Sequence, residues 1–408
     1  MPIYRIDELC KGKGMINADL IFFDAGGGHR AAAEALRLVM EEQGGWNIRL
    51  VNLQERLDPI DWVRKLTGLR MQDFYNLMLK KGWTLGSPQA VRVLQSFIRL
   101  LHPRQVRLLE EFWRSSPADL VVSVVPHFNR ALAQSLRQVR PPTRFVTILT
   151  DIADYPPHFW IEPQEQFFIC GSERAVLQAR ALGIRDERIF QTSGMILHPR
   201  FYRPILCDRR EERKHRGLDP DLPTGLVLFG GQGSNAMLEI AERLDAEGPH
   251  NLQLIFICGR NQKLADALRW RRSRLRSFVE GFTTQVPFYM LLSDFLIGKP
   301  GPGSVSEAVA MRLPVIVERN AWTLPQERYN AEWVLEKQLG LVVRGPHQIP
   351  AAVKVLLERG NLARFRAQAA TIRNRAVYEI PGILGRIVEG SPDRPALEPE
   401  KLLSEQRA

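Results

Sequence analysis

Short apolar runs alternate with longer amphipathic stretches along most of the chain. Five runs rich in Val, Ile, Leu and Phe predict strands in the first half: Asp19–Asp24, Ile48–Leu53, Leu120–Val125, Phe145–Thr150 and Gln166–Cys170. Six similar runs predict strands in the second half: Gly225–Phe229, Leu252–Ile257, Phe278–Phe282, Asp294–Ile297, Pro314–Val317 and Leu341–Val343. Continuous apolar strands separated by helical patterns are typical of parallel sheets that are covered on both faces. The pattern therefore predicts an α/β fold with two tandem Rossmann-like, doubly wound domains that face an interdomain cleft.

A stretch rich in proline and charge separates the two series of strands. It contains Pro204, Pro220 and Pro223 and the charged run Asp208–Arg216. We therefore expect an N-terminal domain over residues 1–203, a linker over 204–223 and a C-terminal domain over 224–390. Residues 391–408, with three prolines and a charged end, are expected to form a loose tail.

One segment, residues 60–107, breaks the alternation because it is mostly helical in pattern and contains no strand. It carries nine basic residues against two acidic ones, with aromatic residues such as Trp62, Phe74 and Trp83 between them. A basic amphipathic segment with aromatic residues favours contact with an anionic membrane surface. Ordinary packing helices with a solvated basic face would show the same pattern. Nucleic-acid binding is not expected, because no nucleic-acid motif accompanies the charge.

The composition narrows the class of protein without choosing a partner. Among 408 residues, 56 Lys and Arg against 45 Asp and Glu give a net charge of +11, which favours anionic partners such as phosphorylated substrates or membranes. The four cysteines lie far apart, which is typical of a reducing compartment. No apolar run approaches the ~20 residues of a spanning helix. We therefore expect a cytoplasmic protein that contacts a membrane only peripherally, at its cytoplasmic face.

The sharpest local signal is the run Phe22–Arg30, in which a predicted strand leads into three glycines, His29 and a helix-favouring segment. Such a junction leaves free backbone N–H groups at a helix start, where glycine permits close approach of a ligand. His29 at this position can accept a proton near neutral pH. The structural alternative is a histidine that caps its helix or packs under the loop.

Three loops in the second half also follow predicted strands and precede helices. Gly298–Ala308 brings glycines to a helix start, which suits a diphosphate. Gly230–Asn235 is a second glycine-rich loop, and Pro325–Asn330 offers carboxamide and carboxylate groups to sugar hydroxyls. Each loop alone has a plain strand-to-helix turn as its alternative, but several such loops together favour a ligand site. Asp151 and Asp154, which are three residues apart and have no acidic neighbours, predict no metal site.

Taken together, these motifs resemble the monogalactosyldiacylglycerol synthase and processive diacylglycerol glycosyltransferase families. These belong to the GT-B glycosyltransferases and are related to the peptidoglycan N-acetylglucosaminyltransferase. The first half carries Gly26–Arg30 with Ala33–Ala35, then Thr150-Asp151 with Pro157–Trp160, then Ser193-Gly194 with Pro199 and Phe201. The second half carries Gly230–Gly233, Pro300–Gly303 with Ser306–Ala308, and Gln326-Glu327 with Asn330.

The resemblance implies an inverting glycosyltransferase that moves a hexose from a UDP-linked donor to a diacylglycerol-type lipid acceptor, without a metal or another cofactor. It implies that His29 is the general base and that Gly27, Gly28, Asp151 and Trp160 lie on the acceptor side. The nucleotide sugar would be held by residues of the second domain: Gly230, Gly231, Gln232, Gly233, Gly301, Pro302, Gly303, Ser304, Glu307, Gln326, Glu327 and Asn330.

The chain departs from the family pattern in two segments, Asp151–Trp160 and Arg319–Leu324, which leaves the acceptor and the sugar open. One alternative is a glycosyltransferase that acts on a soluble or polyprenyl-linked acceptor. Another is a non-catalytic GT-B scaffold that binds a nucleotide sugar or a membrane. A nucleotide-sugar epimerase would share the same two-domain shape.

Overall fold

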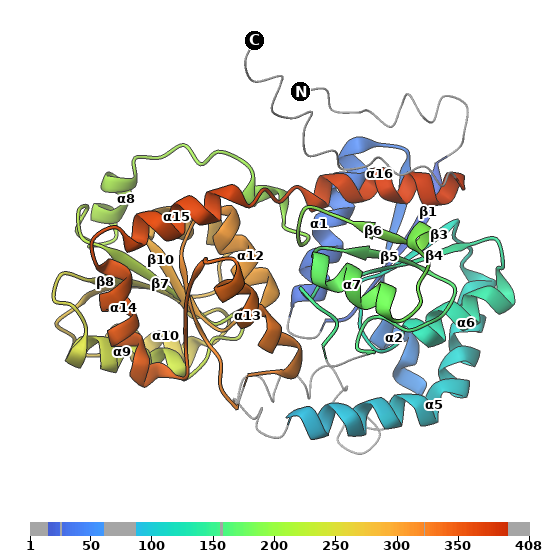
Figure 1. Ribbon diagram of the computed structural model, residues 1–408, viewed down its shortest axis with the longest axis horizontal. Coiled ribbons are helices and arrows are strands. Elements are labelled where there is room, and N and C mark those ends of the chain that lie inside the picture. Colours follow the sequence, from blue (N-terminus) through green and yellow to red (C-terminus); the bar gives the residue numbers. More distant parts are fainter. Residues whose placement is uncertain (1–14, 25–26, 61–86, 156–157, 322, 391–408) are drawn as a thin grey trace, which may run out of the picture.

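The computed structural model of the chain describes residues 15–24, 27–60, 87–155, 158–321 and 323–390. Two six-stranded parallel sheets organise these residues, one in each half of the chain (Figure 1). This arrangement confirms the predicted α/β class with two doubly wound domains. Much of the predicted basic segment, residues 61–86, and the predicted tail lie outside the described residues.

The first sheet has the strand order β2-β1-β3-β4-β5-β6, and every neighbouring pair is parallel. Its strands are β1 (Ile16–Phe22), β2 (Trp46–Asn52), β3 (Leu120–Ser123), β4 (Arg144–Ile148), β5 (Phe167–Cys170) and β6 (Ile189–Gln191). Its helices are α1 (Gly28–Gln43), α2 (Leu53–Leu57), α5 (Ser87–Ser115), α6 (Asn129–Val139) and α7 (Glu173–Ala181), with short 3-10 turns η2 (Asp58–Ile60), η3 (Asp186–Arg188) and η4 (Pro199–Phe201).

The second sheet has the order β12-β11-β10-β7-β8-β9 and is also fully parallel. Its strands are β7 (Thr224–Leu228), β8 (Gln253–Ile257), β9 (Arg276–Glu280), β10 (Phe295–Gly298), β11 (Val315–Glu318) and β12 (Gly340–Val343). Its helices are α8 (Arg209–His215), α9 (Ala236–Glu247), α10 (Gln262–Trp270), α11 (Val286–Leu292), α12 (Pro302–Ala310), α13 (Arg328–Glu336), α14 (Ile349–Leu357) and α15 (Asn361–Thr371), with turns η5 (Pro325–Glu327) and η6 (Pro346–Gln348).

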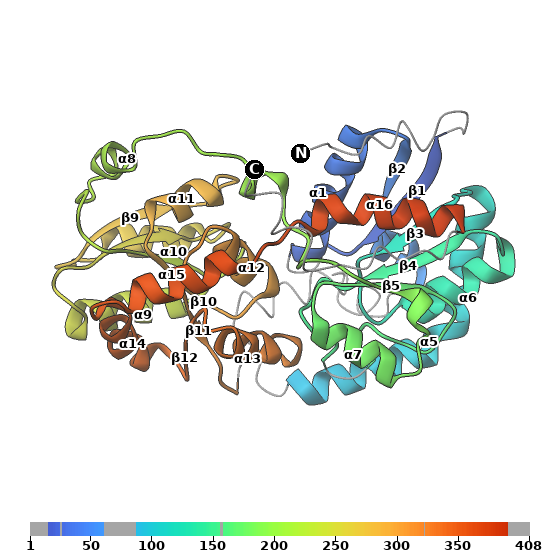
Figure 2. The same cartoon turned by 45° about the horizontal axis from the view of Figure 1, so that its top comes forward.

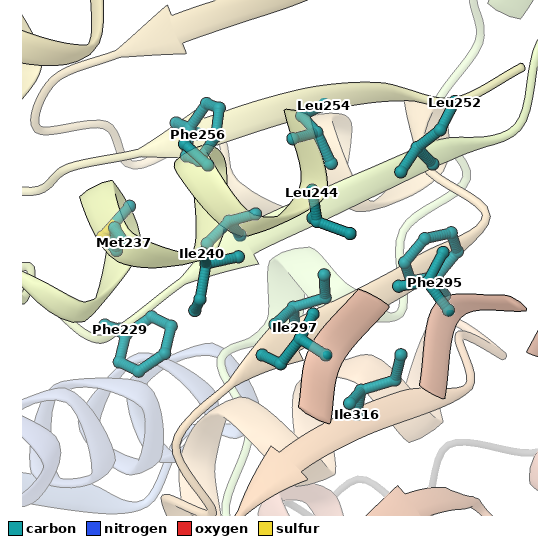
Figure 3. Packing of buried hydrophobic residues seen from close by; sticks show 14 of the residues in the cluster. Phe229, Met237, Ile240, Leu244, Leu252, Leu254, Phe256, Phe295, Ile297 and Ile316 are labelled. Atoms are coloured by element: carbon teal, nitrogen blue, oxygen red, sulfur yellow. The ribbon is translucent and has the colours of Figure 1, made fainter. Parts of the chain in front are cut away.

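Alternate strand residues face opposite layers of helices, so each sheet is buried on both sides. In the first sheet Leu20 packs toward α1, whereas its neighbour Ile21 packs toward α5 and α6. In the second sheet Leu254 and Ile297 pack against Ile240 and Leu244 of α9, and Figure 3 shows these side chains together in one cluster. Burial on both faces explains why the strands are apolar without alternation.

All eleven predicted strands are present, with ends that move by a few residues. The additional strand is β6, which has only three residues and one buried side chain. The predicted linker differs from the structure, because residues 209–215 form α8 and belong to the second domain. Arg213 of α8 is buried and donates to the Leu292 carbonyl and to the Asp294 carboxylate.

The sequence predicted that residues 224–390 form the C-terminal domain. The last helix, α16 (Ala376–Glu389), instead packs on the first domain. Its buried residues Ala376, Ile380 and Leu384 pack with Leu20 and Val122 in the core of the first sheet. Figures 1 and 2 show α16 crossing from the second domain and lying over the first, beside α1. The second domain is therefore inserted between two parts of the first.

The two connections between the domains lie against each other. The Ser193 backbone N–H and hydroxyl donate to the Glu379 carboxylate at 2.8 and 2.6 Å. The Arg375 backbone N–H donates to Ser193 Oγ at 2.7 Å, and Asn374 donates to the Met195 carbonyl at 2.9 Å. These contacts join the outgoing and returning chain into one paired crossing.

Candidate active site

The predicted site residues lie at the carboxyl ends of the central strands in both sheets. In the first domain the segments that follow β1, β3 and β4 are neighbours, because these strands are adjacent in the sheet. In the second domain the same holds for the segments that follow β7, β10 and β11. Carboxyl-end loops near the point where strand order reverses are the usual ligand-binding position in doubly wound sheets.

His29 is the second residue of α1, and the loop before it ends at Gly27, whose left-handed φ of 83° suits glycine. Its Nδ1 lies 3.2 Å from Thr150 Oγ1, just beyond β4, and its ring lies 5.9 Å from the Trp160 ring. Burial lowers the pKa of His29 from 6.5 to about 4, opposed by a hydrogen bond to the Val124 backbone. The imidazole is therefore unprotonated at neutral pH, as a general base must be.

Asp151 follows Thr150 in the sequence, and its carboxylate accepts a hydrogen bond from the Trp160 side chain. The Trp160 side chain is fully buried and donates from Nε1 to Asp151 Oδ2 at 2.8 Å. Asp154 accepts from the backbone N–H groups of Trp160 and His158 at 2.6 and 3.1 Å, which fixes the loop. Trp160 thus supports the site and does not present its ring to solvent.

Burial raises the pKa of Asp151 to about 7, and nearby charges modify this further. Glu327 raises the pKa and Lys299 lowers it, and both of these residues belong to the second domain. The structure therefore brings the segment after β4 close to the segments after β10 and β11. A carboxyl group that titrates near neutral pH between two domains is typical of a functional site.

Lys299 connects the glycine loops of the second domain. Its Nζ lies 3.0 Å from Glu327 Oε1, and Glu327 is largely buried. A Cβ built on Gly230 or on Gly301 would lie 3.7 Å from the Lys299 side chain. One position is thus surrounded by Gly230, Gly301, Glu327 and Lys299. An anion bound there would meet the Lys299 ammonium group and the backbone of the two glycines.

Asn330 supports this arrangement from inside the protein. It is fully buried, and its Nδ2 donates to the Pro300 carbonyl at 2.7 Å. The side chain therefore holds the turn that precedes α12, and the contact with the donor that the resemblance implies for it stays a prediction. Its Oδ1 has no hydrogen-bond partner among the described residues.

Glu307 lies in α12, whose N-cap is Gly301 and whose first turn contains Pro302, Gly303 and Ser304. Burial raises the pKa of Glu307 to about 7, and the charge of Arg200, on the crossing chain, opposes this. Glu307 is therefore a partly buried carboxyl group near the crossing.

The remaining predicted residues lie in the same loops and helix starts. The Gly233 backbone N–H donates to the Gly230 carbonyl at 3.2 Å, Gln232 lies between them, and Gly303 and Ser304 lie in the first turn of α12. Gly231 accepts a hydrogen bond from the Arg260 backbone at 2.9 Å, and Gly233 has the left-handed φ of 63° beside the Cys258 carbonyl. Gly28 begins α1, and Gln326 lies in η5 next to Glu327.

Sequence reasoning missed two residues, Lys299 and His127. Lys299 stands inside a motif that was recognised for its glycines, so its positive charge was the available signal. His127 follows β3, and its φ of 68° is unusual for a residue other than glycine. Burial lowers the pKa of His127 to about 3, and the charge of His29 lowers it as well, so the two imidazoles are neighbours.

The described residues contain no group of three or more His, Cys, Asp or Glu side chains that could hold a metal ion. They also contain no helix that is long and apolar enough to span a bilayer. The metal-free reaction stays a prediction.

No family model matches the chain. Sequence comparison with known proteins finds relatives that carry the name monogalactosyldiacylglycerol synthase. Monogalactosyldiacylglycerol synthase 2 of Arabidopsis thaliana is 28% identical over 349 residues, which cover 81% of this chain and 72% of the relative. Monogalactosyldiacylglycerol synthase of Spinacia oleracea is 28% identical over 388 residues, which cover 90% of this chain and 72% of the relative.

Solved structures show the same fold. MnaA of S. aureus in complex with UDP has a TM-score of 0.61 at 15% identity, with 93% of this chain and 99% of that chain covered. MurG of Acinetobacter baumannii has a TM-score of 0.60 at 10% identity, with 91% and 99% covered. The calicheamicin glycosyltransferase CalG4 has a TM-score of 0.57 at 16% identity over the same shares. This chain is a glycosyltransferase of the GT-B fold, and the monogalactosyldiacylglycerol synthases are its homologues.

Proposed function

We propose that this protein is an inverting glycosyltransferase that transfers a hexose from a UDP-linked donor to a diacylglycerol-type lipid acceptor. The relatives named monogalactosyldiacylglycerol synthase support the hexose and the lipid acceptor. The likeness to a structure that contains UDP supports the fold that such a donor requires. We further propose that the protein works at a membrane surface, with the basic segment 60–107 in contact with anionic lipid.

The observation that carries the proposal is the neutral imidazole of His29 at the carboxyl edge of the first sheet. Thr150 Oγ1 and the Val124 backbone hold the ring in place, and the unprotonated nitrogen of this neutral imidazole accepts the proton of the acceptor hydroxyl. The resulting alkoxide-like oxygen attacks the anomeric carbon from the face opposite the diphosphate, and the bond from that carbon to the diphosphate oxygen breaks. Single displacement of this kind inverts the anomeric configuration.

The second domain supplies the charge stabilisation that the leaving diphosphate needs. Lys299 is paired with Glu327 in this structure, and α12 begins next to it with free backbone N–H groups. The positive end of the helix and the ammonium group favour the growing negative charge. The same groups would serve any nucleoside diphosphate, so they do not choose the base or the sugar.

The decisive experiment replaces His29 by Ala and measures transfer from UDP-galactose and UDP-glucose to diacylglycerol in mixed micelles. General-base catalysis contributes about 10²–10⁴-fold, so kcat should fall by at least 100-fold while UDP binding, measured by calorimetry, is unchanged. The exposed His347→Ala in the second domain is the matched control. Normal transfer by His29→Ala would show that this residue is not the base.

Two further measurements separate the alternatives. A thermal-shift screen with UDP-, GDP- and dTDP-sugars identifies the nucleotide, since only the true donor should stabilise the protein strongly. A UDP-N-acetylglucosamine 2-epimerase of known structure shares the fold, with a TM-score of 0.56 at 12% identity. Product analysis with donor alone tests epimerisation, because a transferase leaves the configuration of the sugar unchanged when no acceptor is present.

A further inference from the structure

A cavity of about 200 Å³ lies in the first domain between α5, the start of α6 and the segments that follow β3 and β4. One water needs only about 10–15 Å³ of such space, whereas pockets that enclose a whole small ligand measure about 300–1,000 Å³. The cavity therefore suits one end of a larger molecule. Its lining includes Ile98, His102, Gln105, His127, His158 and Glu162.

Gln105, on α5, is the most informative lining residue. Only 2% of it is exposed, and its Oε1 has no hydrogen-bond partner among the described residues. A buried carbonyl oxygen without a partner is costly and is rare in folded proteins. Gln105 belongs to the lining of the cavity, so a ligand bound against this wall would lie next to its side-chain amide.

The histidines add further polar groups. His102 Nε2 lies 2.8 Å from Gln134 Oε1, which can only accept, so Nε2 is the donor of that bond. His158 Nδ1 lies 3.3 Å from the Ile161 carbonyl oxygen and is the donor there by the same argument. His127 is neutral at physiological pH, because burial lowers its pKa to about 3. The cavity is therefore rich in polar groups.

The backbone on one side of the cavity is held in an uncommon conformation. His127 has a φ of 68° and His158 a φ of 64°, both in the left-handed region. Residues other than glycine adopt this strained conformation rarely, and such residues cluster at binding sites. The His127 backbone N–H donates to the Phe159 carbonyl at 2.8 Å, which ties the two histidine segments together.

The cavity adjoins the base. His29 bonds to the backbone of Val124, three residues before His127, and the charge of His29 acts on His127. The Trp160 ring, two residues after His158, lies 5.9 Å from the His29 ring. The two segments that form one wall of the cavity are thus the segments that surround His29.

We propose that this cavity is a subsite for the hydroxyl-rich head group of a lipid, either a hexose or a glycerol unit, beside the reacting hydroxyl. The inference rests on the proposed function, because it concerns the acceptor side of that reaction. Sugar and glycerol hydroxyls donate as well as accept, so they can bond to the Glu162 carboxylate, to the neutral His127 imidazole and to the Gln105 amide on the cavity wall. A phosphate monoester dianion offers no hydrogen-bond donor and would lie beside the Glu162 carboxylate. Arg99 and Arg130, which also line the cavity, can bond to hydroxyl oxygens.

The test uses two variants that keep the local structure. Gln105→Met replaces the side-chain amide by an apolar group of similar volume. His158→Asn removes the imidazole, and asparagine tolerates the left-handed backbone at this position. Inhibition of transfer to diacylglycerol is measured with monohexosyl-diacylglycerol and, separately, with 1-O-alkylglycerol in mixed micelles. We expect competitive inhibition that weakens about fivefold to tenfold in each variant, with the KM for the donor unchanged. His347→Asn is the control.

The lipid that competes identifies the source of the head group, hexose or glycerol. Unchanged inhibition in both variants, or no competition by either lipid, would overturn the proposed subsite, and His158→Asn decides alone if Gln105→Met does not fold. If the unaltered protein transfers no sugar to diacylglycerol, the proposed function fails. Direct binding of monohexosyl-diacylglycerol, compared between the unaltered protein and the variants by calorimetry, then still tests the subsite.

Discussion

Thr150 is the residue that fixes the orientation of the His29 imidazole, through the 3.2 Å contact between its Oγ1 and His29 Nδ1. Thr150→Val removes the hydroxyl with little change of shape. One lost hydrogen bond of about 1 kcal/mol should lower kcat about fivefold, with the KM for the donor unchanged. Initial rates across pH test this, and Thr150→Ser should restore activity. A Thr150→Val enzyme with unchanged kcat would contradict the positioning role.

Glu318, at the end of β11, gives a pH prediction. Burial raises its pKa from 4.5 to about 7, the charge of Glu239 adds to this, and its Oε1 has no partner among the described residues. The folded state therefore holds this proton more tightly than the unfolded state, and the associated stability is present below pH 4.5 and lost as pH rises through 7. Glu318→Gln removes that loss.

Urea unfolding at pH 5 and pH 8 measures the effect. The free energy of unfolding of Glu318→Gln should match that of the unaltered protein within error near pH 5 and exceed it by on the order of 1–3 kcal/mol at pH 8. The exposed Glu358→Gln serves as the control and should change little at either pH. If Glu318→Gln and the unaltered protein had equal free energies of unfolding at both pH values, burial would not raise the pKa of Glu318.

At the residue scale, sequence patterns indicated which positions cluster but not which side chains are accessible. His29, Gly230, Gly301 and Glu327 were predicted for the site, and the structure places them at the carboxyl edges of the sheets. The burial of Trp160 and Asn330 depends on packing between distant segments, which the local sequence does not reveal. Gln105 is one polar residue within a helical pattern, and only the structure shows that it is buried and lines a cavity.

At the scale of elements, α16 shows where sequence reasoning stops. Apolar runs predicted eleven strands correctly, because a strand buried on both faces needs a continuous apolar stretch. The amphipathic pattern of a helix indicates a buried face but does not name the sheet that covers it. For α16 the chain order suggested the second domain, whereas the helix returns to the first.

Ile380→Ala tests the packing of α16. Ile380 is 1% exposed in the core of the first sheet, and truncation of a buried isoleucine costs about 2–5 kcal/mol. Hydrogen exchange should become faster mainly in β1 and β3 and remain slow in β7 and β10. The half-exposed Leu335→Ala in α13 should have little effect. Faster exchange confined to the second sheet would contradict the placement of α16.

At the scale of the whole molecule, the basic surface of α5 is the described part of the proposed membrane contact. Arg99, Arg104 and Arg107 are exposed on α5, and Leu100 beside them is 74% exposed. Near an anionic membrane each basic residue contributes about 1 kcal/mol. Replacing all three arginines by Gln should therefore weaken binding on the order of 100-fold.

Flotation with vesicles that contain phosphatidylserine, at low salt, measures this binding. A triple variant of the second domain with the same loss of charge, Lys263→Gln, Arg272→Gln and Lys354→Gln, is the matched control and should still float. If both triple variants bind alike, the attraction comes from net charge alone and α5 is not the contact. If neither the variants nor the unaltered protein bind, a soluble acceptor is favoured.

The return of α16 to the first sheet has a consequence for biosynthesis. The last strand of that sheet ends at Gln191, and α16 begins at Ala376, which is 376 − 191 = 185 residues later. At about 5–20 residues per second, a ribosome needs roughly 10 to 40 s to make this interval. Throughout that time the nascent first sheet exposes the apolar surface that α16 later covers. The first domain can therefore complete its apolar core only after α16 has been synthesised and has left the ribosome.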